Sequence, residues 1–189
     1  RNKPARLVGG TTIHSSQGLS PESSLRTHSL ALNVQTRQKM SRTVLGVGAM
    51  ATDECSQMQA QLNHADALRM TYARQHKYGL NPLDYWKPTE RHGRIAVSPY
   101  WGDHLQLPPV PASSSMLSPL TGTSNEHKAG ANIFRNADMV FQFEKMMRFT
   151  DKNLIEILEV MRTPKPGKSL TEAQWQKLRA TDLGAAQPD

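Results

Sequence analysis

Residues 43–54 read TVLGVGAMATDE, and this stretch decides the predicted fold. Its first part, residues 43–50, is a short apolar run of the kind that forms a buried β-strand, although it contains two glycines that weaken a strand. The run is followed by the acidic pair Asp53 and Glu54. The sequence therefore predicts a strand that brings two carboxylates to its carboxyl end.

Helical patterns flank this stretch on both sides. Downstream, apolar residues recur at three- and four-residue steps over residues 56–76, which predicts a helix that Gly79 closes. Upstream, Ser20 and Pro21 are a typical N-cap and first helical residue, and we expect that helix to run to about Met40. Further helices are predicted over residues 126–136, 154–161 and 170–180.

Two more short apolar segments are predicted to be strands, at residues 95–98 and 139–143. The segment between them contains a Ser-, Pro- and Thr-rich stretch, residues 111–125, which we expect to be a surface loop. Strands that alternate with helices predict an α/β layered fold with a mostly parallel sheet.

Composition limits the class of protein. The 189 residues include 23 Lys and Arg against 16 Asp and Glu, and 37% are hydrophobic. No apolar run approaches the roughly 20 residues of a membrane span, so we expect no membrane partner. A single cysteine excludes a disulfide scaffold, and the opening residues show no initiator Met and no secretory signal. These features favour an intracellular piece of a longer protein.

The positive charge is concentrated near the start of the chain. Residues 1–48 contain seven basic residues and one acidic residue, whereas the remainder is nearly balanced. A local basic excess is typical of a protein that binds a polyanion, usually nucleic acid. A solvated basic face without a partner explains the same excess about as well.

The acidic residues suggest nucleotide chemistry. Asp53 and Glu54 follow one predicted strand and Asp103 follows another, and parallel sheets bind ligands beyond the carboxyl ends of their strands. An aspartate there can hold Mg²⁺ through water, and an adjacent glutamate can deprotonate an attacking water. The simpler alternative is a pair of solvated strand ends.

One segment is more specific. Residues 102–110 read GDHLQLPPV, which resembles the GDxxQLPPV motif III of superfamily-one DNA helicases of the Pif/RecD-like branch. Residues 10–19, GTTIHSSQGL, are similar to the family's G-x-T-I-H-S-x-x-G-L segment near bound single strand. Residues 53–57, DECSQ, resemble its D-E-x-S-M Walker-B motif, and residues 147–151, MRFTD, resemble its R-x-x-D stretch.

The resemblance implies an incomplete parallel-sheet RecA-like (P-loop NTPase) lobe over residues 1–145, and the start of a following segment over 146–189. It implies part of an ATP-dependent DNA helicase that couples Mg-ATP hydrolysis to unwinding, with roles in DNA repair or recombination. The partners would be single-stranded DNA and the remainder of the same chain, in the nucleus or mitochondrion.

The family's roles extend to matching positions here. Glu54 would be the base on the attacking water, Asp53 the Mg²⁺ ligand, and Gln106 the sensor of the γ-phosphate. Arg148 would reach the phosphates, and Asp103 would lie at the nucleotide. The residues expected to contact DNA are Thr12, His14, Ser15, Arg37 and Lys39.

One family motif is absent from the 189 residues. No G-x-x-x-x-G-K-[ST] loop, which cradles the phosphates, precedes the first segment, and residues 162–169 match it only in part. We therefore expect the isolated chain to bind ATP poorly and to unwind nothing. Two alternatives stay open, a nucleic-acid-binding module without turnover and a decayed helicase remnant of a mobile element.

Overall fold

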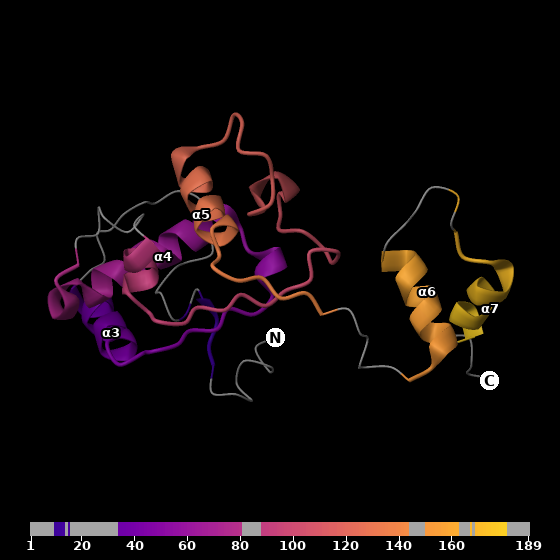
Figure 1. The fold of residues 1–189 in the computed structure, drawn as a ribbon, viewed down its shortest axis with the longest axis horizontal. Coiled ribbons are helices and arrows are strands. Elements are labelled where there is room, and N and C mark those ends of the chain that lie inside the picture. The colour runs from indigo at the N-terminus through magenta and orange to yellow at the C-terminus, as the bar shows by residue number, and fades with distance from the viewer. Residues whose placement is uncertain are drawn as a thin grey trace. The chain divides into compact units, whose positions relative to one another are not determined.

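The computed structural model describes residues 10–13, 15, 34–80, 88–143, 150–162, 167 and 169–180. Contacts divide the chain into two units, Arg1–Asp138 and Met139–Asp189. Figure 1 shows helices α3, α4 and α5 in the first unit and α6 and α7 in the second. No helix in the described ranges is both long and apolar enough to cross a membrane.

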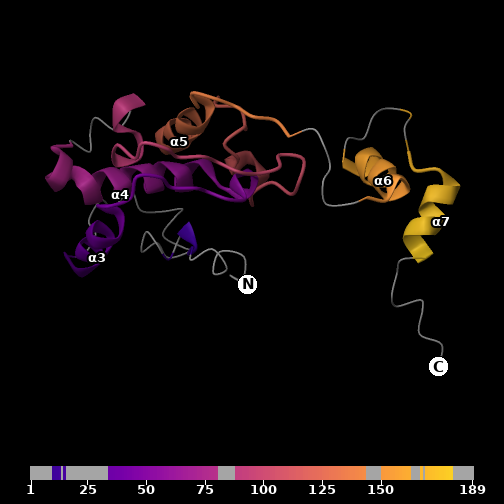
Figure 2. The same ribbon diagram turned by 60° about the horizontal axis from the view of Figure 1, so that its bottom comes forward.

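Helix α4, Ala60–Tyr78, is the centre of the first unit. Figure 2 shows it running the length of this unit, with α3 (Val34–Val44) against one side and α5 (Asn125–Arg135) against another. It confirms the helix predicted over residues 56–76, except that Cys55–Gln57 forms a separate 3-10 turn, η2. Gly79 ends α4 as predicted, in the left-handed conformation at φ 62°, with its N–H donated to the carbonyl of Gln75.

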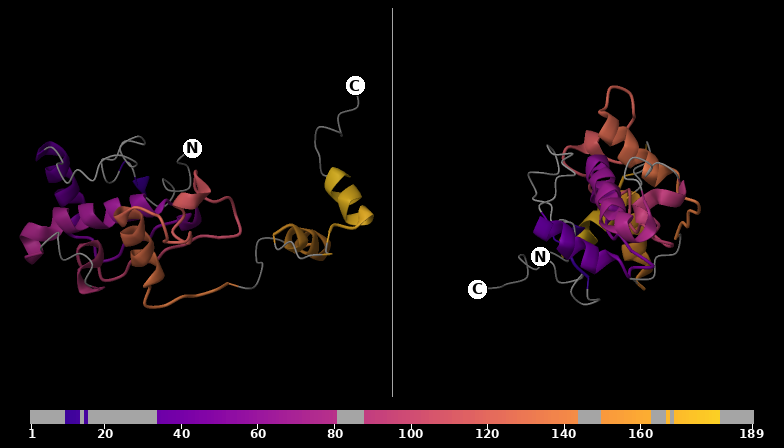
Figure 3. Two further views of the ribbon diagram at one scale, coloured as in Figure 1. Left: turned by 90° about the horizontal axis from the view of Figure 1, so that it is seen from above. Right: turned by 90° about the vertical axis from the view of Figure 1, so that its left-hand side faces the viewer.

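Helix α5 confirms the helix predicted over residues 126–136. Its N-cap is Ser124, whose hydroxyl accepts the N–H of His127 at 3.2 Å. The helix lies across the N-terminal half of α4 (Figure 3). Small residues permit this crossing, because Ala60 and Ala131 are completely buried there. Around them lies a core cluster of Cys55, Met58, Ala60, Leu62, Met116 and Ala131.

Helix α3 packs on the other end of α4. Its predicted start at Ser20 lies outside the described residues, and its end at Val44 is one turn beyond the predicted Met40. Met40 and Val44 are four residues apart on one face. They are buried with Met70, Ala73 and Ile95 in a second core cluster.

A buried arginine joins these elements. Arg74 of α4 donates from Nε to the carbonyl of Gly93 at 2.6 Å, and from Nη1 to the carbonyls of Val44 at 2.6 Å and Val47 at 2.8 Å. Only 4% of Arg74 is exposed. The planar fork of a guanidinium suits three carbonyls that come from two separate segments.

We expect Arg74→Lys to lower the free energy of unfolding by about 2 kcal/mol, because a single ammonium cannot reach all three carbonyls and leaves buried acceptors unpaired. Urea unfolding followed by circular dichroism measures this loss. The exposed Arg42→Lys is the control and should change stability by less than about 0.5 kcal/mol. Equal stability of the two variants would contradict the role given to Arg74.

The predicted α/β fold with a parallel-sheet RecA-like lobe is wrong. The described residues form helices and no strand, and β-pairing is limited to three isolated bridges. Of the three predicted strands, residues 43–50 begin inside the last turn of α3, continue as a turn and reach one isolated bridge, from Ala49 to Val97 of the predicted strand 95–98. Residues 139–143 have no bridge to any described segment, and their large apolar side chains, Met139, Val140, Phe141 and Phe143, are 73–86% exposed.

Residues 48–55 and 97–101 nevertheless run parallel and share backbone hydrogen bonds. Val97 donates to Gly48 at 3.3 Å and accepts from Met50 at 2.9 Å, and Pro99 accepts from Thr52 at 2.9 Å. Between these bonds a continuous ladder would also need an N–H donor at residue 99, and proline has none. The pairing is therefore interrupted, and an isolated pair of extended segments lacks the further strands that stabilise a sheet.

The second unit contains two capped helices. In α6, Lys152–Arg162, Asp151 accepts the N–H groups of Asn153 at 2.8 Å and Leu154 at 3.3 Å. In α7, Glu172–Ala180, Thr171 and Gln174 exchange hydrogen bonds as a capping box. Both helices were predicted from apolar spacing, and Ile157 is the residue of α6 that is buried.

Candidate active site

The parallel pairing brings the acidic pair next to the GDHLQLPPV loop. Trp101 donates its N–H to the carbonyl of Thr52, and Cys55 donates its N–H to the carbonyl of Trp101, both at 2.8 Å. Gly102 follows directly, and a Cβ at this position would lie 2.8 Å from the sulfur of Cys55. The two segments meet so closely because residue 102 is glycine.

Glu54 has a strained backbone at this junction. Its φ of 53° and ψ of 36° are left-handed, a conformation that costs a non-glycine residue roughly 1–2 kcal/mol. The strain arises where the ladder shifts by one residue, since Trp101 pairs with Cys55 instead of Glu54. Asp53 supports the turn by accepting the N–H of Glu54 at 2.9 Å. Both acidic residues are exposed and can meet a ligand.

Gln106 lies in a tight turn of the loop that begins at Gly102. The carboxylate of Asp103 accepts the N–H of Leu105 at 3.1 Å, and its carbonyl accepts the N–H of Gln106 at 3.0 Å. The end of the loop is tied down by Gln59, whose amide donates to the carbonyl of Val110 at 2.7 Å. Gln106 is exposed, so its side chain is available to a ligand.

The donor set is compatible with a magnesium ion that a nucleotide brings. Asp53 and Asp103 offer carboxylate oxygens, which Mg²⁺ prefers, and Mg²⁺ commonly uses one or two carboxylates together with phosphates and waters. Within the described ranges, no three His, Cys, Asp or Glu side chains converge to hold a metal by themselves.

The other predicted residues are placed in part. Thr12 accepts the N–H of Ser15 at 3.3 Å, and Ser15 is exposed. Lys39 is exposed on α3. His14, Arg148 and the side chain of Arg37 lie outside what the structure describes. The structure thus brings the Asp53 and Glu54 segment against the start of the loop that carries Asp103 and Gln106, and leaves the rest as predictions.

Cys55 directly follows the acidic pair and is buried. The pKa of its thiol is raised from 9.0 to about 11, first through burial and then through the charge of Asp53. The thiol therefore stays protonated at neutral pH and is not a reactive thiolate.

A buried polar cluster beneath this site was not predicted. Tyr100 donates its hydroxyl to Oδ1 of Asn63 at 2.7 Å, and Asn63 donates to the carbonyl of Gly130 at 2.8 Å. The hydroxyl also lies 2.9 Å from Nε2 of His92. Because Tyr100 has one proton and gives it to Asn63, Nε2 of His92 must carry the proton of the second bond. The sequence shows only that two polar residues, Asn63 and Asp66, lie three apart on a predicted helix. The structure adds that nearly all faces of this helix are buried.

Asp66 has no good ionic partner in this cluster. Its Oδ2 lies 3.9 Å from Nε2 of His92, which is too far for a hydrogen bond, and Oδ1 has no hydrogen-bond partner among the described residues. Burial raises the pKa of Asp66 to about 7, and Arg69 lowers it less. Burial, followed by the charge of Arg91, lowers the pKa of His92 to about 4. Burial also raises the pKa of Tyr100.

The pKa shifts of Asp66 and His92 predict opposite effects of pH on stability. The raised pKa of Asp66 gives stability that is present at low pH and lost as pH rises from 3.8 to about 7. The lowered pKa of His92 gives stability that is present above 6.5 and lost as pH falls to about 4. We expect Asp66→Asn to gain stability relative to the wild type as pH rises through this window.

The paired variant His92→Gln should gain stability relative to the wild type as pH falls from 6.5 to 4. Urea unfolding at each pH measures both differences. A constant difference for Asp66→Asn across this range would show that the folded and unfolded states bind the Asp66 proton equally.

Comparison with known proteins found no match: no family model, no curated protein and no solved structure matches the chain.

Proposed function

We propose that this chain is part of an ATP-dependent DNA helicase and carries the residues that act on the γ-phosphate of ATP. The observation that carries the proposal is the meeting of the DE pair with the GDHLQLPPV loop, through the Cys55 to Trp101 hydrogen bond of 2.8 Å. In the family that the sequence resembles, these two motifs face the same nucleotide. The two motifs are almost 50 residues apart in the sequence, and this spacing alone does not require them to be in contact.

The proposed chemistry assigns one task to each side chain. Asp53 would hold the nucleotide's cation through water, and Glu54 would accept a proton from the attacking water. The water oxygen bonds to the γ-phosphorus as the bond to the β–γ bridging oxygen breaks, so that ADP and phosphate leave. When it is bound, Mg²⁺ neutralises charge on the phosphate oxygens.

Gln106 is proposed to report the presence of the γ-phosphate. Its turn is held by Asp103 on one side and by the Gln59 to Val110 hydrogen bond on the other. A change in the turn would therefore be transmitted to the N-terminal end of α4. We infer that this is how the nucleotide state reaches the rest of the first unit.

The test is Mg-ATP hydrolysis by the full-length gene product, with and without single-stranded DNA. We expect hydrolysis that DNA stimulates. The 189 residues alone contain no phosphate-cradling loop, and we expect them to be inactive. DNA binding without hydrolysis by the full-length protein would overturn the proposal in favour of a passive nucleic-acid-binding module, and loss of both would favour a decayed remnant.

A further inference from the structure

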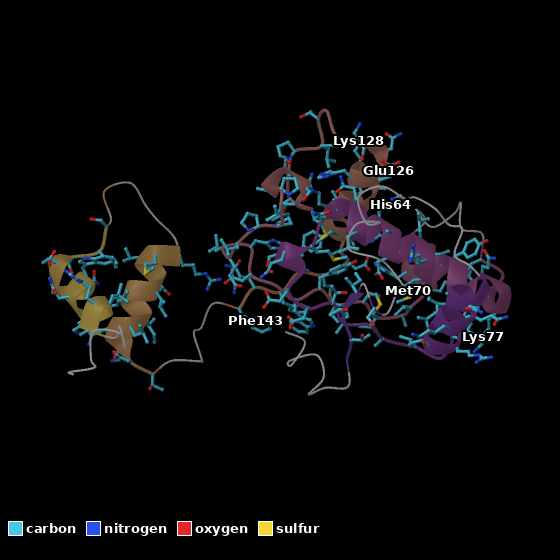
Figure 4. All side chains as sticks on the ribbon, turned by 180° about the vertical axis from the view of Figure 1, so that it is seen from behind. His64, Met70, Lys77, Glu126, Lys128 and Phe143 are labelled. Atoms are coloured by element: carbon cyan, nitrogen blue, oxygen red, sulfur yellow. The ribbon has the colours of Figure 1, made fainter. Side chains whose placement is uncertain are left out.

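The end of the first unit where α3 meets the C-terminal turns of α4 is strongly basic. Three exposed cations lie on these two helices, Lys39 and Arg42 on α3 and Lys77 on α4. We call these three residues the basic end. Figure 4 labels Lys77, whose side chain points away from the unit beside α3, far from Lys128 on α5.

Tertiary contacts hold the two helices together at this end. Ser41 donates its hydroxyl to the carbonyl of Ala73 at 3.1 Å, and Tyr78 donates its hydroxyl to the carbonyl of Leu45 at 3.0 Å. Arg42 follows Ser41, and Lys77 is one turn beyond Ala73. Cations that are 35 residues apart in the chain therefore lie on adjoining helices at the same end of the first unit.

The two helix segments that carry these cations supply no acidic residue of their own. Residues 34–52 contain no Asp or Glu, and residues 67–80 contain none either. The nearest acid along α4 is Asp66, which is only 2% exposed and holds its proton more tightly than an ordinary carboxyl because burial raises its pKa to about 7.

The exposed cations are not needed to cap the helices. The carbonyl of Val44 is bonded by Arg74 and that of Leu45 by Tyr78, while the carbonyl of Ser41 accepts the N–H of Leu45. The carbonyls of Ser41, Val44 and Leu45 are thus satisfied by other groups. Lys77 makes only a contact with the ring of Tyr78, 5.4 Å from its centroid, among the interactions described.

We propose that the basic end binds the phosphate backbone of a single-stranded nucleic acid. Charge complementarity identifies the partner, because exposed cations on two adjoining helix segments that contain no acid suit a polyanion and repel other cations. The proposal deepens the proposed function and rests on it for the identity of the strand. It adds Arg42 and Lys77 to the predicted contacts and gives Lys39 a defined surface.

The test is the salt dependence of binding of an oligothymidylate by the 189-residue chain, measured by fluorescence anisotropy. The variant combines Lys39→Gln, Arg42→Gln and Lys77→Gln. The control removes the same charge elsewhere, by Lys128→Gln, Lys152→Gln and Lys177→Gln on α5, α6 and α7. All six residues are exposed, so circular dichroism should show both variants folded.

For single strands, each phosphate contact contributes about 0.7 to the slope of log affinity against log salt. Loss of three contacts should lower the slope by about 2 and the affinity roughly 100-fold at about 0.1 M salt. The control should keep the wild-type slope. An equal loss in both variants, or no binding by the wild type, would overturn the proposal.

Polyglutamate provides the second arm. If it binds as tightly as the oligonucleotide and loses affinity equally in the variant, the basic end recognises acidic proteins and the nucleic-acid assignment fails. Failure of the proposed function is distinguishable, since a full-length protein that does not hydrolyse ATP would leave the salt slope of the chain unchanged.

Discussion

Replacement of Glu54 by glutamine is expected to lower DNA-stimulated ATP hydrolysis by the full-length protein roughly 10²–10⁴-fold, the usual effect of removing one general base. The amide keeps the size of the side chain but cannot accept a proton from water. It also keeps the left-handed backbone of Glu54, so the fold should be unaffected. Steady-state release of phosphate measures the loss.

A second substitution at the same position separates catalysis from stability. Glu54→Gly also removes the base, but glycine accepts φ 53° without strain. We therefore expect the variant to be about 1 kcal/mol more stable to urea and equally inactive. This combination, inactive but more stable, is the signature of a strained residue that is kept for its function.

The control for both variants is Glu156→Gln, the same chemical change at an exposed position of α6. It should hydrolyse ATP at the wild-type rate. If Glu54→Gln retains full hydrolysis, Glu54 is not the base and the assignment of this pair is wrong.

The second large effect is expected at the crossing of α4 and α5. A Cβ on Gly130 would lie 1.7 Å from the carbonyl oxygen of Ala60 and 3.0 Å from the backbone nitrogen of His64. These are main-chain atoms within a helix and cannot move aside separately. The two helices must separate, and the hydrogen bond of 2.8 Å from Asn63 to the carbonyl of Gly130 would be lost with the contact.

We expect Gly130→Ala to lower the free energy of unfolding by about 3 kcal/mol or more, at the upper end of the cost of overpacking. The sign is informative, because Gly→Ala inside a helix with free space stabilises by roughly 0.5–1 kcal/mol. Gly46→Ala is the control, since no atom lies within 4 Å of its Cβ position. Thermal unfolding of both variants decides whether the helices are in contact at Gly130.

Local sequence rules predicted the helices well. Gly79 ends α4, and helices were correctly predicted where α5, α6 and α7 form. Helix periodicity and caps depend on residues within about four positions of one another, which a sequence displays directly. Asp151, the last residue of the R-x-x-D stretch, follows the same local rule, because it caps the N-terminus of α6.

The predicted sheet failed because strand pairing depends on distant partners. Thr43 and Val44 are β-branched, yet they complete α3, where Val44 gains burial against Met70 and Ile95. Residues 139–143 are apolar but pair with no described segment. An apolar run shows that the segment gains stability from burial or strand pairing. It does not show which other segment will bury it or pair with it.

For the candidate site, the sequence by itself determined the chemistry on offer: two adjacent acids, a glutamine in a proline-bounded loop, and an excess of basic residues near the start. Only the tertiary structure decided that the acidic segment meets the start of this loop, that Glu54 is strained, and that Lys77 of α4 lies at the same end of the first unit as α3 with Lys39 and Arg42. The physical reason is range. Residue type and helix periodicity are local properties, whereas the contacts at Gly102, Gly130 and Arg74 join segments whose approach depends on the packing of the whole unit.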